Sequence, residues 1–395
     1  MVGCARAQIK TADEAMRKIS APPALRAEAS DDLKYSNLAN ALEKTIKRFK
    51  VETATSDTLR FGPKTVTKQK YIEALESLLA LLRDDPSGQK FIESLSHNFD
   101  FYEIYGSKEW GDVFITSYYE PILHGSSQKT ATYSEPLYET PKDLVVIKLS
   151  EFDKAAAPFR TSVPENKLEG VLRARLNSSE TSTQAVPYFT RQEIEEKPLK
   201  SSKVIAWVDP VDAFFLHTQG SGRVILENGK ELRVGYAEQN GYPYVSVGKN
   251  FFDKIPKEKM TRQKIEAYIR SLSKDEARAF MNQNPSFIFF QKLDGEALTS
   301  FGAEVTAGRT VATDAKFFPK GALAFLEFQL PDFNGADPEP TGYHNVSRFV
   351  IDQDTGGAIR GPGRLDLFAG SGPEADRLSG VMRQRGHLYY LVPRD

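Results

Sequence analysis

Cysteine is almost absent from this sequence of 395 residues, which contains one, Cys4. A single cysteine excludes disulfides within the chain and metal sites built from several cysteines. The sequence also lacks any run of about 18 apolar residues, the length that a membrane-spanning helix requires, so we expect no such helix. Basic and acidic residues nearly balance, with a net charge of −1 and no basic block, which gives no support for nucleic-acid binding.

The remaining composition is typical of a folded globular protein, with 40% apolar and 27% charged residues. At roughly 100–200 residues per domain, this length predicts two or three domains. Residues 1–30 show no clear periodicity and predict a flexible N-terminal arm. Apolar residues then recur at helical spacing and predict three helices, at residues 31–49, 67–83 and 90–95.

The character of the chain changes at residues 112–121, an apolar and aromatic run that ends at a proline and indicates a strand. From 121 to about 257 short strand-like runs predominate, and Asn228 with Gly229 between two of them predicts a hairpin. The polar stretch 150–183 predicts long loops. We expect strands at residues 144–149, 203–208, 213–218, 223–226, 232–236 and 245–247, forming a barrel or sandwich.

Helical spacing returns at residues 261–283, where Ser273 and Glu276 form a capping-box pattern. Short strand-like runs then continue to the C-terminus. They lie at residues 287–291, 310–312, 323–328, 348–351, 365–368 and 388–392. A mixed region thus encloses a strand-rich one, which predicts that one domain is inserted into another.

Three aspartates lie near the C-terminus, in a stretch that predicts two strands joined by glycine-rich turns. Asp352 and Asp354 follow the first apolar run, and Asp366 lies in the second. We expect all three at strand ends and loop edges, where tight loops often place acids in a cleft. Capping of turns is the alternative role for such residues.

Five stretches between residues 116 and 375 occur together and in a fixed order. They are TSYYEP at 116–121, YFTRQEI at 188–194, VDAFFLHTQGSG at 211–222, NPSFIFF at 284–290, and DTGGAI at 354–359 with Asp366 and GPEA at 372–375. From about residue 105 to the C-terminus, the chain therefore resembles the membrane-bound lytic murein transglycosylase A family.

The resemblance implies a mainly β fold with flanking helices. Residues 31–120 and 258–395 would form a double-psi β-barrel catalytic domain, and residues 121–257 an inserted β-domain, with a glycan groove between the two. It also implies cleavage of the β-1,4 bond between N-acetylmuramic acid and N-acetylglucosamine, leaving a 1,6-anhydro ring. Such a carbon-oxygen lyase acting on polysaccharide would use no cofactor and no metal.

In this family one aspartate, matched by Asp366, serves as acid and then as base. An ordinary glycosidase needs two carboxylates, whereas here the sugar's own C6 hydroxyl is the nucleophile. The acid must be protonated near neutral pH, which requires a pKa raised by burial or by a neighbouring carboxylate, and Asp354 is the obvious neighbour.

Thr116, Tyr118 and Gln219 match positions that line the glycan groove in the family. A tyrosine ring packs on the apolar face of a pyranose, and hydroxyl and amide groups bind its hydroxyls. Packing within a β-sheet core is the alternative role for Tyr118. Asp212 matches the family's Val-Asp pair but could equally stabilise a turn, so we assign it no role.

The resemblance further implies glycan strands of peptidoglycan as the partner, cell-wall synthesis or hydrolysis complexes as possible assemblies, and no nucleic acid. It places the protein in the periplasm of a Gram-negative bacterium, anchored to the outer membrane through a lipidated Cys4. The sequence VGCA at 2–5 is similar to the end of a bacterial lipobox, although the charged and apolar regions of a signal peptide do not precede it. Either the chain starts close to a processed N-terminus or Cys4 is incidental.

Other interpretations of these residues fit less well. The triplet at 354–356 matches that of aspartic proteases, which need two such triplets, and no second one occurs. An EF-hand loop starting at Asp352 would have Gly363 at its twelfth position, which supplies no carboxylate. The five histidines show no metal-ligand spacing, and His217 in an apolar run is expected in the core or groove. The main alternative is a non-catalytic peptidoglycan-binding double-psi barrel protein, against which the presence of both Asp354 and Asp366 argues.

Overall fold

The chain folds into two compact units, residues 1–120 with 296–395 (unit 1) and residues 121–295 (unit 2). The computed structural model describes residues 9, 11–20, 31–51, 57–106, 109–152, 170–248, 261–335 and 337–394. Cys4 and its predicted lipidation lie outside these ranges. No helix within them is long and apolar enough to cross a membrane.

Three helices and a small hairpin open unit 1. The helices are α1 (Leu38–Val51), α2 (Lys68–Asp84) and α3 (Gln89–Asn98), and the hairpin pairs β2 (Thr58–Phe61) with β3 (Lys64–Thr67). All three helices were predicted, and in α2 the expected apolar face is buried. However, α1 starts at Leu38 rather than at residue 31, because the carboxylate of Asp31 accepts hydrogen bonds from the backbone of Leu33 and Tyr35 and holds a turn there.

The predicted flexible arm is wrong for residues 11–20. They form a short 3-10 helix, η1 (Asp13–Ala15), and strand β1 (Met16–Ile19), which pairs antiparallel with β4 (Phe99–Ile104). Ala15 and Met16 are buried in the core. Four residues were too few to show an alternating pattern in the sequence, so the strand was missed.

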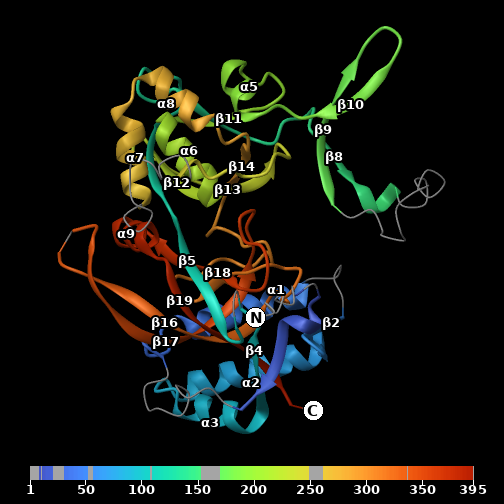
Figure 1. The fold of residues 1–395 in the computed structure, drawn as a ribbon, viewed down its shortest axis with the longest axis vertical. Helices are drawn as coiled ribbons and strands as arrows, with labels where there is room; N and C mark the ends of the chain where they lie inside the picture. Colours follow the sequence, from blue (N-terminus) through green and yellow to red (C-terminus); the bar gives the residue numbers. More distant parts are fainter. Residues whose placement is uncertain are drawn as a thin grey trace, which may run out of the picture. The chain divides into compact units, whose positions relative to one another are not determined.

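Six strands of unit 1 close into a barrel (Figure 1). They are β5 (Asp112–Glu120), β15 (Thr310–Ala312), β16 (Ala322–Phe333), β17 (Pro340–Asp354), β18 (Arg364–Ser371) and β19 (Gln384–Pro393). The order is β19-β16-β17-β15-β18-β5, and pairing of β19 with β5 completes the ring. Two pairs are parallel, β15 with β17 and β5 with β18. The predicted fold class, a mainly β protein with a double-psi barrel built from N- and C-terminal segments, is confirmed.

Unit 2 contains a second, nearly closed barrel of strands in the order β14-β13-β12-β6-β11-β7. They are β6 (Ile122–Ser126), β7 (Glu135–Tyr138), β11 (Val204–Val208), β12 (Ser221–Leu226), β13 (Glu231–Gln239) and β14 (Ile288–Leu293). The predicted hairpin is present between β12 and β13, where Gly229 has a φ of +77° that favours glycine. The helices of this unit are α5 (Arg191–Glu196), α6 (Pro210–Gln219), α7 (Arg262–Ser271) and α8 (Lys274–Met281).

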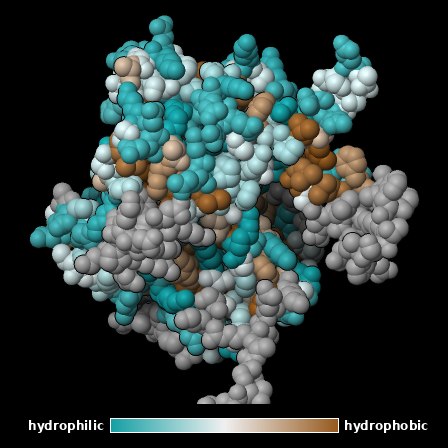
Figure 2. Space-filling model, turned by 45° about the horizontal axis from the view of Figure 1, so that its top comes forward, coloured by the Kyte–Doolittle hydropathy of each residue, from teal (hydrophilic) through white to brown (hydrophobic). Residues whose placement is uncertain are grey.

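A separate three-stranded sheet belongs to unit 2 and projects from its barrel in Figure 1. It consists of β8 (Val145–Lys148), β9 (Val171–Ser178) and β10 (Thr183–Pro187), with η3 (Leu149–Phe152) after β8. Leu172 and Leu176 on β9 are more than half exposed. On the face shown in Figure 2, such apolar areas are small and lie within mainly hydrophilic surface. Because β9 occupies residues 171–178, the expectation of long loops in 150–183 is wrong for this segment.

The predicted strand at 213–218 is wrong, because this segment belongs to helix α6. Asp209 caps the helix by accepting hydrogen bonds from the backbone of Val211 and Asp212, and Pro210 stands in its first turn. Apolar residues occur all round the helix because it packs into two different clusters, so the sequence shows no helical spacing. The expected strand at 245–247 is also not formed.

The return from unit 2 to unit 1 differs from the predicted position at residue 258. Helices α7 and α8 and strand β14 all lie in unit 2, which extends to Gly295. β14 pairs with β13 over six residue positions, and α7 and α8 share an apolar cluster with α6. The change from strand-like to helical sequence near residue 258 therefore does not mark the boundary between the two units.

A buried charge network lies within unit 2. Arg191 is 1% exposed and donates hydrogen bonds to the backbone of Asn284 and Ser286 and to Nδ1 of His217, 2.9 Å away. Since arginine only donates, this nitrogen of His217 must accept, and burial lowers the pKa of His217 well below its usual value. His217 is therefore a neutral core residue on α6.

Two buried carboxylates complete this network. Glu195 pairs with Arg191 and Arg278, and Glu135 pairs with Arg278 at 3.2 Å. Burial, together with the charge of Glu195, raises the pKa of Glu135 to about 7. The folded state thus holds this proton more tightly than the unfolded chain does.

We predict that unit 2 loses stability as pH rises from about 4.5 to about 7, since deprotonation of Glu135 costs more in the folded state. Hydrogen exchange of peptides from β7 and α8, corrected for the intrinsic exchange rate at each pH, should show decreasing protection across this range. Glu135→Gln, which stays uncharged, should reduce the pH dependence, whereas Glu231→Gln at the surface should keep it. An unchanged pH dependence in Glu135→Gln would contradict the prediction.

Candidate functional site

Strand alternation places Asp366 on the polar face of β18. Its neighbours Leu365 and Leu367 are buried in the barrel core, so Asp366 points to the opposite face. The parallel register sets Asp366 beside Thr116 on β5, and the Thr116 hydroxyl donates a hydrogen bond to Asp366 Oδ1. The structure thus brings together two predicted site residues that lie 250 positions apart in sequence.

Asp366 is largely buried but accessible, with 20% of its side chain exposed. Burial raises the pKa of its carboxyl, while the nearby guanidinium of Arg364 and the Thr116 hydroxyl act in the opposite direction. The Nε of Arg364 lies 3.6 Å from Asp366 Oδ1. A carboxylic acid whose pKa is raised by burial, and whose side chain stays partly exposed, can exchange a proton with a bound substrate. Of the two predicted causes, burial and a neighbouring carboxylate, burial is the main cause of this rise.

Asp354 ends β17 and is held by three donors. The Tyr118 hydroxyl donates to its Oδ2 at 3.0 Å, and the backbone N–H groups of Ser300 and Thr355 donate to Oδ1 at 2.8 and 2.9 Å. Burial raises the pKa of Asp354 and these hydrogen bonds lower it. Burial raises the pKa of Tyr118 well above its usual value, so its phenol keeps the proton that it donates.

One residue links the two aspartates. Ala312 on β15 pairs with Asp354 on one side and with Asp366 on the other. The α-carbons of Asp354 and Asp366 are therefore two strand spacings apart, about 10 Å. Tyr118 lies next to Phe368 with 5.1 Å between ring centroids, and its hydroxyl reaches Asp354. The site therefore contains Asp366, to which one hydroxyl donates, and Asp354, which three hydrogen bonds hold more firmly.

Asp352, the third predicted aspartate, does not belong to this site. It lies inside β17 with its side chain fully buried, contrary to the expected strand-end position. It accepts hydrogen bonds from Thr313 and Tyr390 and forms an ion pair with Lys320 at 2.7 Å. Lys320 is 32 residues upstream and Tyr390 is 38 residues downstream, so no local sequence signal indicated this core network.

Comparison with known families agrees with this geometry. Residues 114–291 match the model of the MltA specific insert domain, and residues 309–392 match the 3D domain model. Together the two models cover more than half of the chain, including both aspartates. The chain belongs to the membrane-bound lytic murein transglycosylase A family. The predicted resemblance is thereby confirmed.

Relatives with this name are similar over most of the chain. The protein of Escherichia coli K12 is 27% identical over 297 residues, which are 74% of this chain and 69% of the relative. The Vibrio cholerae relative is 27% identical over 292 residues, 72% of this chain and 67% of its own. Both are named membrane-bound lytic murein transglycosylase A.

Solved structures of the family share the fold. A membrane-bound lytic murein transglycosylase from Agrobacterium tumefaciens has a TM-score of 0.72 at 24% identity, covering 96% of this chain and 98% of that one. E. coli MltA with bound chitohexaose has a TM-score of 0.68 at 20% identity, covering 97% and 96%. At such low identity these likenesses establish the fold alone.

The remaining predicted groove residue, Gln219, lies in unit 2, where it is the last residue of α6 and is half-buried. Asp212 on the same helix forms an ion pair with Arg270 of α7, which fits a structural role. Within each unit, the structure thus brings Thr116 and Tyr118 to the aspartates, while Gln219 belongs to the other unit.

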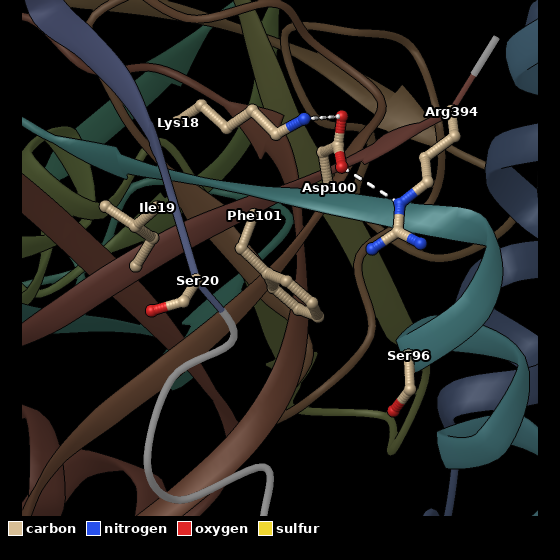
Figure 3. Close-up of a pocket in the computed structure, with 7 residues that line it drawn as sticks. All are labelled: Lys18, Ile19, Ser20, Ser96, Asp100, Phe101 and Arg394. Carbon is tan, nitrogen blue, oxygen red and sulfur yellow. Dashed lines mark hydrogen bonds and ion pairs between the residues drawn. The ribbon is translucent and has the colours of Figure 1, made fainter.

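A pocket of about 460 Å³ lies elsewhere on unit 1, beside β1 and β4 (Figure 3). Lys18 and Arg394 both point to Asp100 and form ion pairs with it, and Ile19 and Phe101 line the apolar side. Its lining includes none of the predicted site residues. Within the described ranges no group of three potential ligand side chains could hold a metal ion.

We predict that Asp352→Ala destabilises unit 1 by about 3–5 kcal/mol, because it removes the counter-ion of Lys320 and the carboxylate that accepts from two buried hydroxyls. Chemical denaturation followed by near-UV circular dichroism measures the change. The exposed Asp332→Ala on the β16–β17 ribbon is the matched control and should alter stability by less than about 1 kcal/mol. Equal stability of the two variants would show that Asp352 is not part of the core.

Proposed function

We propose that this chain is a peptidoglycan lytic transglycosylase that cleaves the β-1,4 bond between N-acetylmuramic acid and N-acetylglucosamine. The observation that carries the proposal is the setting of the Asp366 carboxyl group. Burial raises its pKa, and the Thr116 hydroxyl donates a hydrogen bond to it. Family membership supports the same reaction, because the relatives are named lytic murein transglycosylases.

In the proposed mechanism Asp366 first protonates the glycosidic oxygen, so that the bond to C1 of N-acetylmuramic acid breaks. The resulting carboxylate then takes the proton of the sugar's C6 hydroxyl, whose oxygen bonds to C1 and closes the 1,6-anhydro ring. Asp366 ends the cycle protonated, and no water, cofactor or metal takes part. One carboxyl group can therefore replace the two that glycoside hydrolysis requires.

Asp354 serves the same site as a second, fixed carboxyl group. Its three hydrogen bonds hold it in one orientation, so it is less suited than Asp366 to exchange protons with a substrate. We assign it the role of binding and orienting the sugar near Asp366. Its bond from Tyr118 keeps the aromatic ring in place beside Phe368.

We assign substrate binding to Thr116, Tyr118 and Gln219. Hydroxyl, phenol and amide groups suit the hydroxyl and acetamido groups of amino sugars, and a tyrosine ring suits the sugar's apolar face. The crystal structure of E. coli MltA with bound chitohexaose supports an oligosaccharide as the ligand class. The partner is then a glycan strand of peptidoglycan.

We further propose that the protein works in the periplasm, anchored to the outer membrane by lipidation of Cys4. The relatives' printed names, which call them membrane-bound, support an envelope location. Mass spectrometry of the protein isolated from its native membrane tests the anchor, since a lipidated Cys4 adds the mass of a diacylglyceryl group. A soluble protein with a free Cys4 thiol would contradict it.

We predict that Asp366→Asn abolishes product release while folding and glycan binding stay intact, because the amide can neither donate nor accept the reaction's proton. Mass spectrometry of soluble fragments from purified murein sacculi should show 1,6-anhydro ends with the wild type and none with the variant.

Other outcomes of this experiment have distinct meanings. Reducing ends from the wild type would show that water is the nucleophile and that a second catalytic carboxylate exists. Binding of sacculi without any product would indicate the non-catalytic peptidoglycan-binding alternative. Retention of a tenth of the activity by Asp366→Asn would assign the acid to another residue, with Asp354 first in line.

We predict that Tyr118→Ala weakens binding of chitohexaose at least tenfold, because the ring surface that would stack on a sugar is lost. Isothermal titration calorimetry measures the affinity, and thermal unfolding checks that the fold is kept. Tyr118→Phe keeps the ring and loses the bond to Asp354, so it should bind with a smaller loss. An unfolded Tyr118→Ala protein would support the core-packing alternative instead.

A further inference from the structure

Arg364 holds a position that strand geometry ties to Asp366. The two residues are two apart on β18, so both side chains leave the same face of the strand. The Nε of Arg364 lies 3.6 Å from Asp366 Oδ1, and the side chains are 33% and 20% exposed. This Nε is buried and has no hydrogen-bond partner among the described residues, so its contact with Asp366 is an ion pair at longer distance.

Few other charges lie on the elements around Asp366. Tyr118 stands on β5 and keeps its proton, and Asp354 at the end of β17 is bound by three donors. Helix α9 (Pro373–Val381), which packs against β5 and β18, carries Glu374, Asp376 and Arg377, and Arg377 is bound to the backbone of Gly335. Arg385 on β19 pairs with Asp112. Within the described part of the chain, Arg364 is the cation that forms an ion pair with Asp366.

We propose that Arg364 is a positioning residue that stabilises the carboxylate of Asp366 formed between the two proton transfers, a role that rests on the proposed function. Asp366 loses its proton to the glycosidic oxygen and regains one from the C6 hydroxyl, so its negative charge exists only between these steps. Arginine stays protonated throughout and exchanges no proton itself. A fixed cation close to a charge that develops during reaction lowers the energy of that state.

This role balances the effect of burial. Burial raises the pKa of Asp366, which favours the protonated acid needed at the start, and Arg364 partly reverses that rise. Without the guanidinium, the acid would be protonated more of the time but would release its proton less easily. The Thr116 hydroxyl stabilises the same carboxylate, so the anion keeps one donor when Arg364 is replaced.

The test measures the titration of Asp366 directly. The protein is labelled with ¹³C at the aspartate carboxyl carbons, and the Asp366 signal is assigned by its absence in Asp366→Asn. We expect Arg364→Gln to raise the pKa of Asp366 by about one unit or more, since an opposite charge within about 4–6 Å typically lowers a carboxyl pKa by 1–3 units. Arg364→Lys, which keeps the charge, should restore most of the wild-type value.

The second readout is the pH dependence of 1,6-anhydro product release. In Arg364→Gln the alkaline limb of the rate profile should move to higher pH by the same amount, and the maximal rate should fall at least tenfold with chitohexaose affinity unchanged. Arg385→Gln removes an arginine of β19, a strand that among the described residues pairs with β5 and not with β18, and this arginine forms an ion pair with Asp112. The substitution should leave both the titration and the profile in place.

The outcomes separate this inference from the proposed function. An unshifted Asp366 titration in a folded Arg364→Gln or Arg364→Met protein overturns the role of Arg364, even if activity falls. A shifted titration in a protein whose wild type releases no 1,6-anhydro products would uphold the electrostatic pairing while rejecting the transglycosylase reaction. Equal shifts in Arg364→Gln and Arg385→Gln would show a general charge effect and would also overturn it.

Discussion

The site depends on the register of one three-residue strand, β15. Ala312 on this strand pairs with Asp354 and with Asp366, so the two carboxyl groups are placed by backbone hydrogen bonding rather than by side-chain packing. Because a slip of one residue would turn every side chain to the other face, closure of the barrel around β15 determines whether the site exists.

Three aspartates within 15 positions take three different roles because their surroundings differ. Asp352 is neutralised by a lysine and two hydroxyl donors and is part of the core. Asp354 is held by two backbone N–H groups and a phenol. Asp366 has one hydroxyl donor and one cation at a longer distance, together with the partial exposure that a proton-exchanging group needs. The number of fixed hydrogen bonds, more than burial itself, distinguishes the group suited to chemistry.

Much of this could be predicted from the sequence, for physical reasons. Helices with one apolar face, such as α2, and hairpins with an Asn-Gly turn, such as β12–β13, depend on local preferences and were found. Helix α6 is buried on several sides and was mistaken for a strand, because full burial removes the period that identifies a helix. The role of Asp352 and the placement of residues 258–295 in unit 2 depend on partners distant in sequence. Arg364 could have been found from the alternation of β18, since it stands two residues before the predicted acid.

Unit 2 is inserted between two segments of unit 1, yet the residues around Asp366 still come together. Strand β5 ends at Glu120, unit 2 follows, and the chain returns to unit 1 at Glu296. Yet Thr116, Tyr118, Asp354, Arg364 and Asp366 all lie in unit 1, and every contact described among them is within that unit. The parallel pairing of β5 with β18 forms when the barrel closes, so the contacts described around Asp366 are made by residues of unit 1. The proton chemistry proposed for Asp366 therefore depends on the closure of the unit 1 barrel, which brings together strands that precede and follow unit 2 in the chain.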